Sequence, residues 1–110
     1  MLLAVAAVVA STGQAAGKGG LVIDPTTVAR GATFELSGCG YPTPTSLSFH
    51  VVGPVVDYFT AGEPLTAADG CFSQTWTAWW SEAGDYSITS YYRDAKGSTR
   101  KVAVVKFSVT

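Results

Sequence analysis

The segment most diagnostic of the architecture is Glu82-Ala83-Gly84-Asp85-Tyr86-Ser87-Ile88. Gly84 lets the backbone turn at low steric cost. Tyr86, two residues later, can bury its ring while its hydroxyl bonds to backbone upstream. This combination is typical of a strand that enters the core at a corner of a β-sandwich. The segment predicts a fold, but it identifies neither a ligand nor a reaction.

The sequence on both sides of this corner favours strands throughout. Short runs of β-branched and aromatic residues alternate with polar residues, and 12 Gly and 5 Pro separate the runs. We predict an all-β chain, a two-sheet antiparallel sandwich with Greek-key connections. About seven strands are expected, over residues 21–28 (interrupted by Pro25), 32–37, 46–52, 55–60, 71–79, 85–93 and 100–109.

The corner segment resembles the D-x-G-x-Y-x-C signature of the immunoglobulin superfamily. Glu82 takes the place of the Asp, and Ile88 takes the place of the Cys. The resemblance implies an immunoglobulin-like sandwich with a tyrosine corner made by Glu82, Gly84 and Tyr86. Because Ile88 replaces the cysteine, we expect packing to close the centre of the core and any disulfide to lie elsewhere.

A second resemblance covers most of the chain after residue 20. Residues 21–40, 69–73 and 107–110 look like parts of the immunoglobulin-like domains of exported bacterial or phage proteins. The first hairpin is also similar to that of the neocarzinostatin family, small secreted sandwiches that hold an enediyne chromophore in a cleft. Members of that family carry two disulfides, whereas this chain has two cysteines. A small-ligand carrier of this type is therefore a distant alternative.

The N-terminal residues have the pattern of a secretory signal peptide. An uncharged apolar run, 2–10, precedes small residues at the positions Gly13 and Ala15, where a signal peptidase would recognise the chain. The run is too short to span a bilayer, which takes about 20 residues. We predict a signal peptide over 1–15, a linker over 16–20 and the sandwich over 21–110. The alternatives are a first strand or helix, or an apolar tail against lipid or a partner.

The two cysteines, Cys39 and Cys71, predict one structural disulfide, as an even count does in a small exported domain. Placing them opposite each other pairs the second and fifth predicted strands with Ser37 facing Ser73. That register also aligns the hydrophobic faces of the two strands. We therefore expect a protein that is secreted or displayed at the cell surface. In a protein that is not exported, the alternative is a pair of free thiols.

The charge balance excludes strong global attraction to nucleic acid. Seven basic and eight acidic residues give a net charge of −1. Five of the seven bases lie between Arg93 and Lys106, where they can meet phosphate-rich polymers. We prefer the interpretation that they provide solubility and protect a sheet edge, because lysines beside edge strands commonly do so.

The sequence offers no catalytic or metal-binding pattern. His50 is the single histidine and points outward by strand alternation, and no G-x-S-x-G motif is present. The spacings that separate His50 from Cys39 and Cys71 fit no closed zinc site. We expect no enzyme activity, no metal and no cofactor.

Two surface features remain as candidate binding sites. Trp79 and Trp80 are adjacent in a strand and cannot both face the core. They are candidate exposed aromatics, which would suit sugar faces or protein partners. The alternative is that they plug the end of the sandwich.

The second feature is a candidate interface on the outward side of the third, sixth and seventh strands. There an apolar patch with a cationic rim is expected, which a small domain rarely exposes without a partner. Its residues are His50, Val52, Tyr91, Arg93, Val102, Val104 and Lys106. The fourth strand or the N-terminal segment can instead cover this patch.

These observations favour a non-catalytic, secreted or surface-displayed binding or adhesion module. Its expected partner is a protein or a cell-envelope polymer. The alternative is a structural assembly subunit, such as a virion decoration or extracellular fibre protein, which would self-associate through the face that carries Val102 and Val104.

Overall fold

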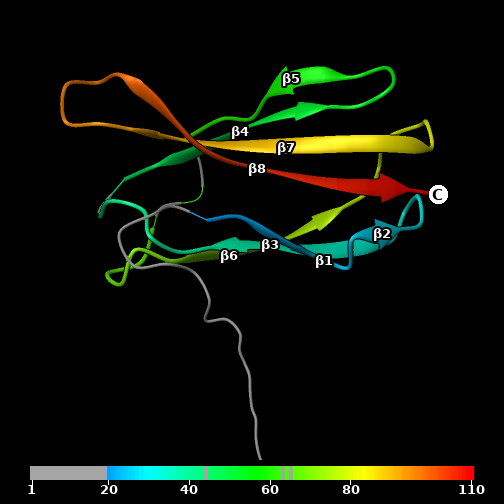
Figure 1. The fold of residues 1–110 in the computed structure, drawn as a ribbon, viewed down its shortest axis with the longest axis horizontal. Helices are drawn as coiled ribbons and strands as arrows, with labels where there is room; N and C mark the ends of the chain where they lie inside the picture. Colours follow the sequence, from blue (N-terminus) through cyan, green and yellow to red (C-terminus); the bar gives the residue numbers. More distant parts are fainter. Residues whose placement is uncertain (1–19, 44, 63, 65) are drawn as a thin grey trace, which may run out of the picture.

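The computed structural model describes residues 20–43, 45–62, 64 and 66–110. In this part of the chain, eight strands form two layers that face each other (Figure 1). The strands are β1 (Val22–Asp24), β2 (Thr27–Val28), β3 (Thr33–Gly38), β4 (Leu47–Val52), β5 (Asp57–Phe59), β6 (Phe72–Thr77), β7 (Gly84–Arg93) and β8 (Thr99–Val109). The predicted signal peptide, 1–15, lies outside the described residues.

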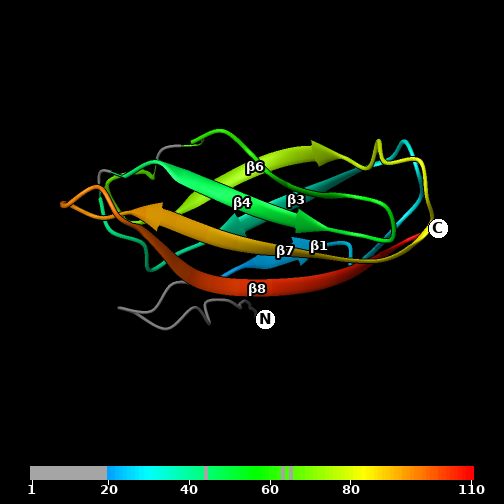
Figure 2. The same ribbon diagram turned by 90° about the horizontal axis from the view of Figure 1, so that it is seen from above.

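The strand order confirms an immunoglobulin-like two-sheet sandwich. One sheet has the order β1-β3-β6, and the other has the order β2-β8-β7-β4-β5. All neighbours are antiparallel except β2 and β8, which run parallel. From above, β1 and β6 lie at opposite sides of the three-stranded sheet (Figure 2). Among the described residues, no helix has the length and apolar character needed to cross a membrane.

The predicted first strand divides into two, so the sandwich has eight strands rather than seven. Residues 22–24 pair with β3, and 27–28 pair with β8 in the other sheet. The chain changes sheet at Asp24–Pro25, whose peptide bond is cis. Proline donates no backbone hydrogen bond, so both segments lie at sheet edges.

The register of β3 and β6 agrees with the register expected from the cysteines. Ser37 pairs with Ser73, and three residues earlier, on the opposite face of the strand, Phe34 pairs with Trp76. Cys39 and Cys71, just beyond the ends of these strands, form the predicted disulfide. Disulfides persist outside the reducing cytosol, so the bridge indicates an extracytoplasmic location.

The core is made by the inward residues of both sheets. On β4 the burial alternates, with Leu47, Phe49 and Val51 fully buried. Ile88 pairs with Val51 across the strands and is also fully buried. Packing therefore closes the core at the position where the superfamily signature has a cysteine.

The corner that precedes β7 has the expected hydrogen bond. The Tyr86 hydroxyl donates to the Glu82 carbonyl oxygen at 2.5 Å, and the Tyr86 ring is buried. Gly84 has a φ of 143°, and a Cβ atom there would lie 2.8 Å from a ring carbon of Pro54. Only glycine fits this position without displacing its neighbour.

An irregularity in the β7–β8 ladder changes the orientation of one predicted interface residue. Ser90 pairs with Ala103, but the next residue, Tyr91, pairs with Lys101. Val102 is therefore the extra residue of a β-bulge, and its side chain packs against the core. The expectation that Val102 points outward with Val104 is wrong for this reason.

Candidate functional site

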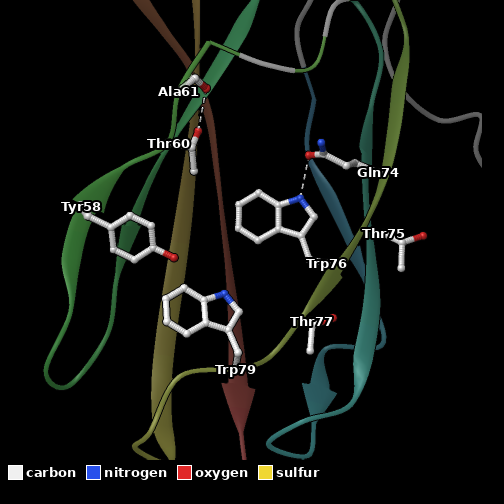
Figure 3. A pocket seen from close by; sticks show the side chains of 8 residues that line it. All are labelled: Tyr58, Thr60, Ala61, Gln74, Thr75, Trp76, Thr77 and Trp79. Carbon is white, nitrogen blue, oxygen red and sulfur yellow. Dashed lines mark hydrogen bonds between the residues drawn. The ribbon is translucent and has the colours of Figure 1, made fainter.

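A cleft opens where the free edges of the two sheets approach each other. β5 is the last strand of the five-stranded sheet, and β6 is the last strand of the three-stranded sheet. The cleft between them has a volume of about 470 Å³. Figure 3 shows the residues that line it, which are Tyr58, Thr60, Ala61, Gln74, Thr75, Trp76, Thr77 and Trp79. We call this site the β5/β6 cleft.

The two consecutive tryptophans have opposite roles at the cleft. Alternation continues past the end of β6, so Ala78 and Trp80 turn inward while Trp79 turns out. Trp79 is 69% exposed, whereas Trp80 is 2% exposed. The prediction of exposed aromatics therefore holds for Trp79 and is wrong for Trp80. Trp80 is held in the core because its Nε1 donates to the Tyr58 hydroxyl at 3.0 Å.

Trp76 contributes a third aromatic ring to the cleft and packs against the core of the sandwich. It packs edge-on against the buried Phe49, with ring centroids 5.6 Å apart. Its Nε1 donates to Oε1 of Gln74 at 2.8 Å, which leaves the Gln74 amide nitrogen as a donor beside the ring (Figure 3). Trp76 is half-buried, so part of its ring surface is available in the cleft.

The β5/β6 cleft carries no formal charge, because all eight lining residues are aromatic, hydroxyl, amide or alanine side chains. The acid nearest along the ladder is Glu35, which pairs with Thr75. The hydroxyls of Thr75 and Ser73 donate to its two carboxylate oxygens at 2.6 and 2.9 Å. These two hydrogen bonds, that of Thr75 first, lower the pKa of Glu35 below its ordinary value.

The outward side of the five-stranded sheet, which we call the sheet face, holds most of the predicted interface. His50, Val52 and Tyr91 are half-buried on it, and Val104 and Lys106 are exposed. Strand alternation brings these side chains to one side of β4, β7 and β8, as expected from the sequence.

Of the two remaining predicted interface residues, one packs inward and the other lies at the end of β7. Val102 packs inward at the bulge described above. Arg93 lies at the end of β7, where its guanidinium donates to the Gly97 carbonyl oxygen at 3.1 Å within the turn that leads to β8. In the same turn Arg100 pairs with Asp94 at 2.8 Å, which lowers the pKa of Asp94.

Two functional candidates on β5 were missed in the sequence analysis. Phe59 is 58% exposed, and its ring stacks on His50 with centroids 4.4 Å apart and planes 4° apart. Oδ1 of Asp57 accepts a hydrogen bond from Nε2 of His50 at 2.6 Å. A count of residues outward from a turn centred on Pro54–Val55 could have found both, because it pairs His50 with residue 59 and Val52 with residue 57.

The described residues hold no group of three or more His, Cys, Asp or Glu side chains placed to bind a metal. The ring of His50 contacts Asp57 and Phe59.

Comparison with known proteins adds similarity of shape. No family model matches this sequence, and no curated protein matches it either. A crystal structure of the soluble domain of PmoD from Methylocystis matches at 15% identity over 77% of this chain and 78% of that one, with a TM-score of 0.47. A Niemann-Pick type C2 protein from the Japanese carpenter ant matches at 17% identity over 88% of this chain and 93% of that one, with a TM-score of 0.49. The functional argument below rests on the residues of this chain.

Proposed function

We propose that this chain is a non-catalytic recognition module, secreted or displayed at the cell surface, that binds a neutral glycan in the β5/β6 cleft. The observation that supports the proposal is an uncharged cleft with three aromatic side chains, Tyr58, Trp76 and Trp79. Around these rings stand hydroxyl and amide groups. A cell-envelope polysaccharide is a ligand of this class, which makes adhesion the use that we favour.

The chemistry of the cleft matches the two surfaces of a sugar ring. The C–H face of a sugar is apolar and stacks on aromatic rings, and Trp79 offers such a ring at 69% exposure. The hydroxyl groups of a sugar need partners, and Thr60, Gln74 and Thr77 offer hydroxyl and amide groups near the rings.

A charged ligand fits this cleft less well than a neutral one. Burying an ion beside uncharged groups costs free energy that no counter-ion here offsets. An extended peptide that added a strand to β5 would find an edge of three residues after Pro54. A neutral glycan avoids the cost of burying a charge.

The proposal can be tested by titrating the protein with neutral oligosaccharides and recording tryptophan fluorescence and NMR shifts. Suitable probes are soluble cello-, xylo- and chito-oligosaccharides, with an anionic oligogalacturonate for comparison. We expect Trp79→Ala to weaken binding about tenfold, because one stacked aromatic ring is worth about 1–1.5 kcal/mol.

Phe59→Ala is the matched control, since it removes another exposed aromatic ring, 58% against 69% for Trp79, from a different surface. It should leave glycan affinity unchanged. Equal affinity of the wild type and Trp79→Ala for every neutral probe would contradict the proposal. Preferential binding of the anionic probe, weakened by salt, would contradict it as well.

A further inference from the structure

The sheet face carries two parallel rows of side chains that cross four strands. Cross-strand pairs connect Phe59 on β5 to His50 on β4, then to Thr89 on β7 and Val104 on β8. We call this set the apolar-ended row. It begins and ends with an exposed hydrophobic side chain, and the two ends lie on the outer strands of the set.

The second row lies two residues further along the strands. It connects Asp57 on β5 to Val52 on β4, then to Ser87 on β7 and Lys106 on β8. We call this set the charge-ended row. Its acid is at the β5 end and its base is at the β8 end, and both residues are exposed.

In each row the two ends could contact each other favourably: one row has a hydrophobic side chain at both ends, and the other has an acid at one end and a base at the other. Phe59 and Val104 are 58% and 51% exposed, so the side chains at both ends of the apolar-ended row are available for contact. Asp57 and Lys106 have opposite charge. A partner that presents the same rows in reverse order would satisfy both ends at once.

We propose that the sheet face pairs with the sheet face of a second copy of this chain, around a two-fold axis parallel to the strands. Such an axis, placed between β4 and β7, lays β5 of one copy over β8 of the other. It keeps each row at its own height along the strands, so Phe59 meets Val104 and Asp57 meets Lys106. Every contact is made twice, as a closed dimer requires.

The packing is of a kind that sheets already use. Two β-sheets stack face to face at about 10 Å, with their strands aligned within about 30°. The stacked His50 and Phe59 rings make one broad surface at the β5 end. The Tyr91 ring extends this surface, with its centroid 5.6 Å from that of Phe59. Because Phe59 and Val104 are the only exposed large hydrophobic side chains among the described residues of this face, we expect a weak dimer that depends on concentration.

Other partners fit the sheet face less well. An anionic polymer would meet Lys106 but also Asp57, whose side chain is 72% exposed. A fibre would need a head-to-tail contact that does not close, whereas a two-fold contact uses up the face of both copies. The inference is independent of glycan binding, because the β5/β6 cleft lies on another side of β5.

Two charge-reversal variants of the purified full chain test the inference by sedimentation velocity. Asp57→Lys places two lysines at each charged contact of its dimer, and Lys106→Asp places two acids there. Each variant alone should dimerise about tenfold more weakly than the wild type, because two attractive pairs become repulsive. An equimolar mixture of both should regain the affinity of the wild type, since each copy then meets the opposite charge.

Phe59→Ala should also weaken the dimer, and Trp79→Ala is the control that should not. Circular dichroism and glycan titration of every variant separate loss of folding from loss of pairing. The inference is wrong if the wild type stays monomeric up to about millimolar concentration. It is also wrong if the mixed variants associate no better than each variant alone. This holds even if the wild type forms dimers, because those dimers would then use another contact.

Discussion

Along one long edge of the sandwich the chain changes sheet within a single extended segment, whereas along the other edge a longer loop connects the sheets. On the first edge β1 and β2 are two halves of one extended segment, joined at Pro25. On the second edge β5 and β6 are consecutive strands of different sheets, and residues 60–71 connect them. The β5/β6 cleft lies on this second edge, bounded by Tyr58, Trp76 and Trp79.

The difference shows how an edge whose two strands are connected only by a longer loop is stabilised and used. The Trp80–Tyr58 hydrogen bond connects the segment after β6 to β5, and so joins the two sheets across the cleft. The same aromatic cluster extends outward to Trp79, whose ring is exposed. We infer that one set of rings closes the sandwich while its outermost member is free to bind a ligand.

The largest effect is expected from removing the ring that joins the sheets. Trp80→Ala would leave a cavity among Phe34, Tyr86 and Phe107, whose rings it contacts. We expect a loss of about 3–5 kcal/mol in the free energy of unfolding, measured by urea denaturation.

Trp79→Ala is the matched control on the neighbouring residue, and it should change stability by less than about 0.5 kcal/mol. Similar losses for the two variants would mean that the structural and binding roles are not divided between them. The loss in the free energy of unfolding for Trp80→Phe, which keeps most of the side-chain volume, should fall between those of the two alanine variants. This variant keeps the test valid if Trp80→Ala fails to fold.

A slightly smaller effect is expected from the disulfide. β6 has a neighbour on one side only, β3, and the Cys39–Cys71 bridge joins the ends of this pair. The two cysteines are 32 residues apart in sequence. Replacing both with alanine should lower the free energy of unfolding by about 3–4 kcal/mol, by the chain-entropy argument.

The measurement is chemical denaturation of the double variant beside the wild type with and without reductant. Reductant should destabilise the wild type towards the level of the variant and leave the variant unchanged. An unchanged midpoint for the double variant would show that β6 is held by packing alone.

Local patterns predicted the parts of the fold that depend on alternation within a strand. The pairing of Ser37 with Ser73 followed from the cysteines and from one hydrophobic face on each strand. Val102 was misplaced because the run from Val102 to Val105 is apolar at every position. Alternation therefore says nothing there about where a bulge falls.

The β5/β6 cleft could not be predicted from such patterns. It depends on which strands become the edges of two different sheets, which is set by the topology of the whole chain. Trp79 was a candidate because it is adjacent to another tryptophan, but Tyr58 carried no local signal. Its role follows from its contact with Trp80, 22 residues away in sequence.

The smallest effect concerns the edge where the chain changes sheet, and it depends on pH. The Tyr41 hydroxyl donates to the Gly20 carbonyl oxygen at 2.7 Å and is hydrogen-bonded to the Ser90 hydroxyl at 2.8 Å. This attaches the segment before β1 to the core. Burial raises the pKa of Tyr41 above its ordinary value of 10.0.

The direction of that pKa shift sets the sign of the effect. The folded protein favours the protonated phenol, so the stabilisation is complete below pH 10 and is lost as the pH rises through the higher folded pKa. Tyr41→Phe should therefore lose less stability than the wild type between neutral pH and about pH 11. Burial also raises the pKa of Tyr86, so a smaller alkaline loss should remain in the variant. Parallel curves of stability against pH for the two proteins would show that Tyr41 ionises as freely in the folded state as in the unfolded chain.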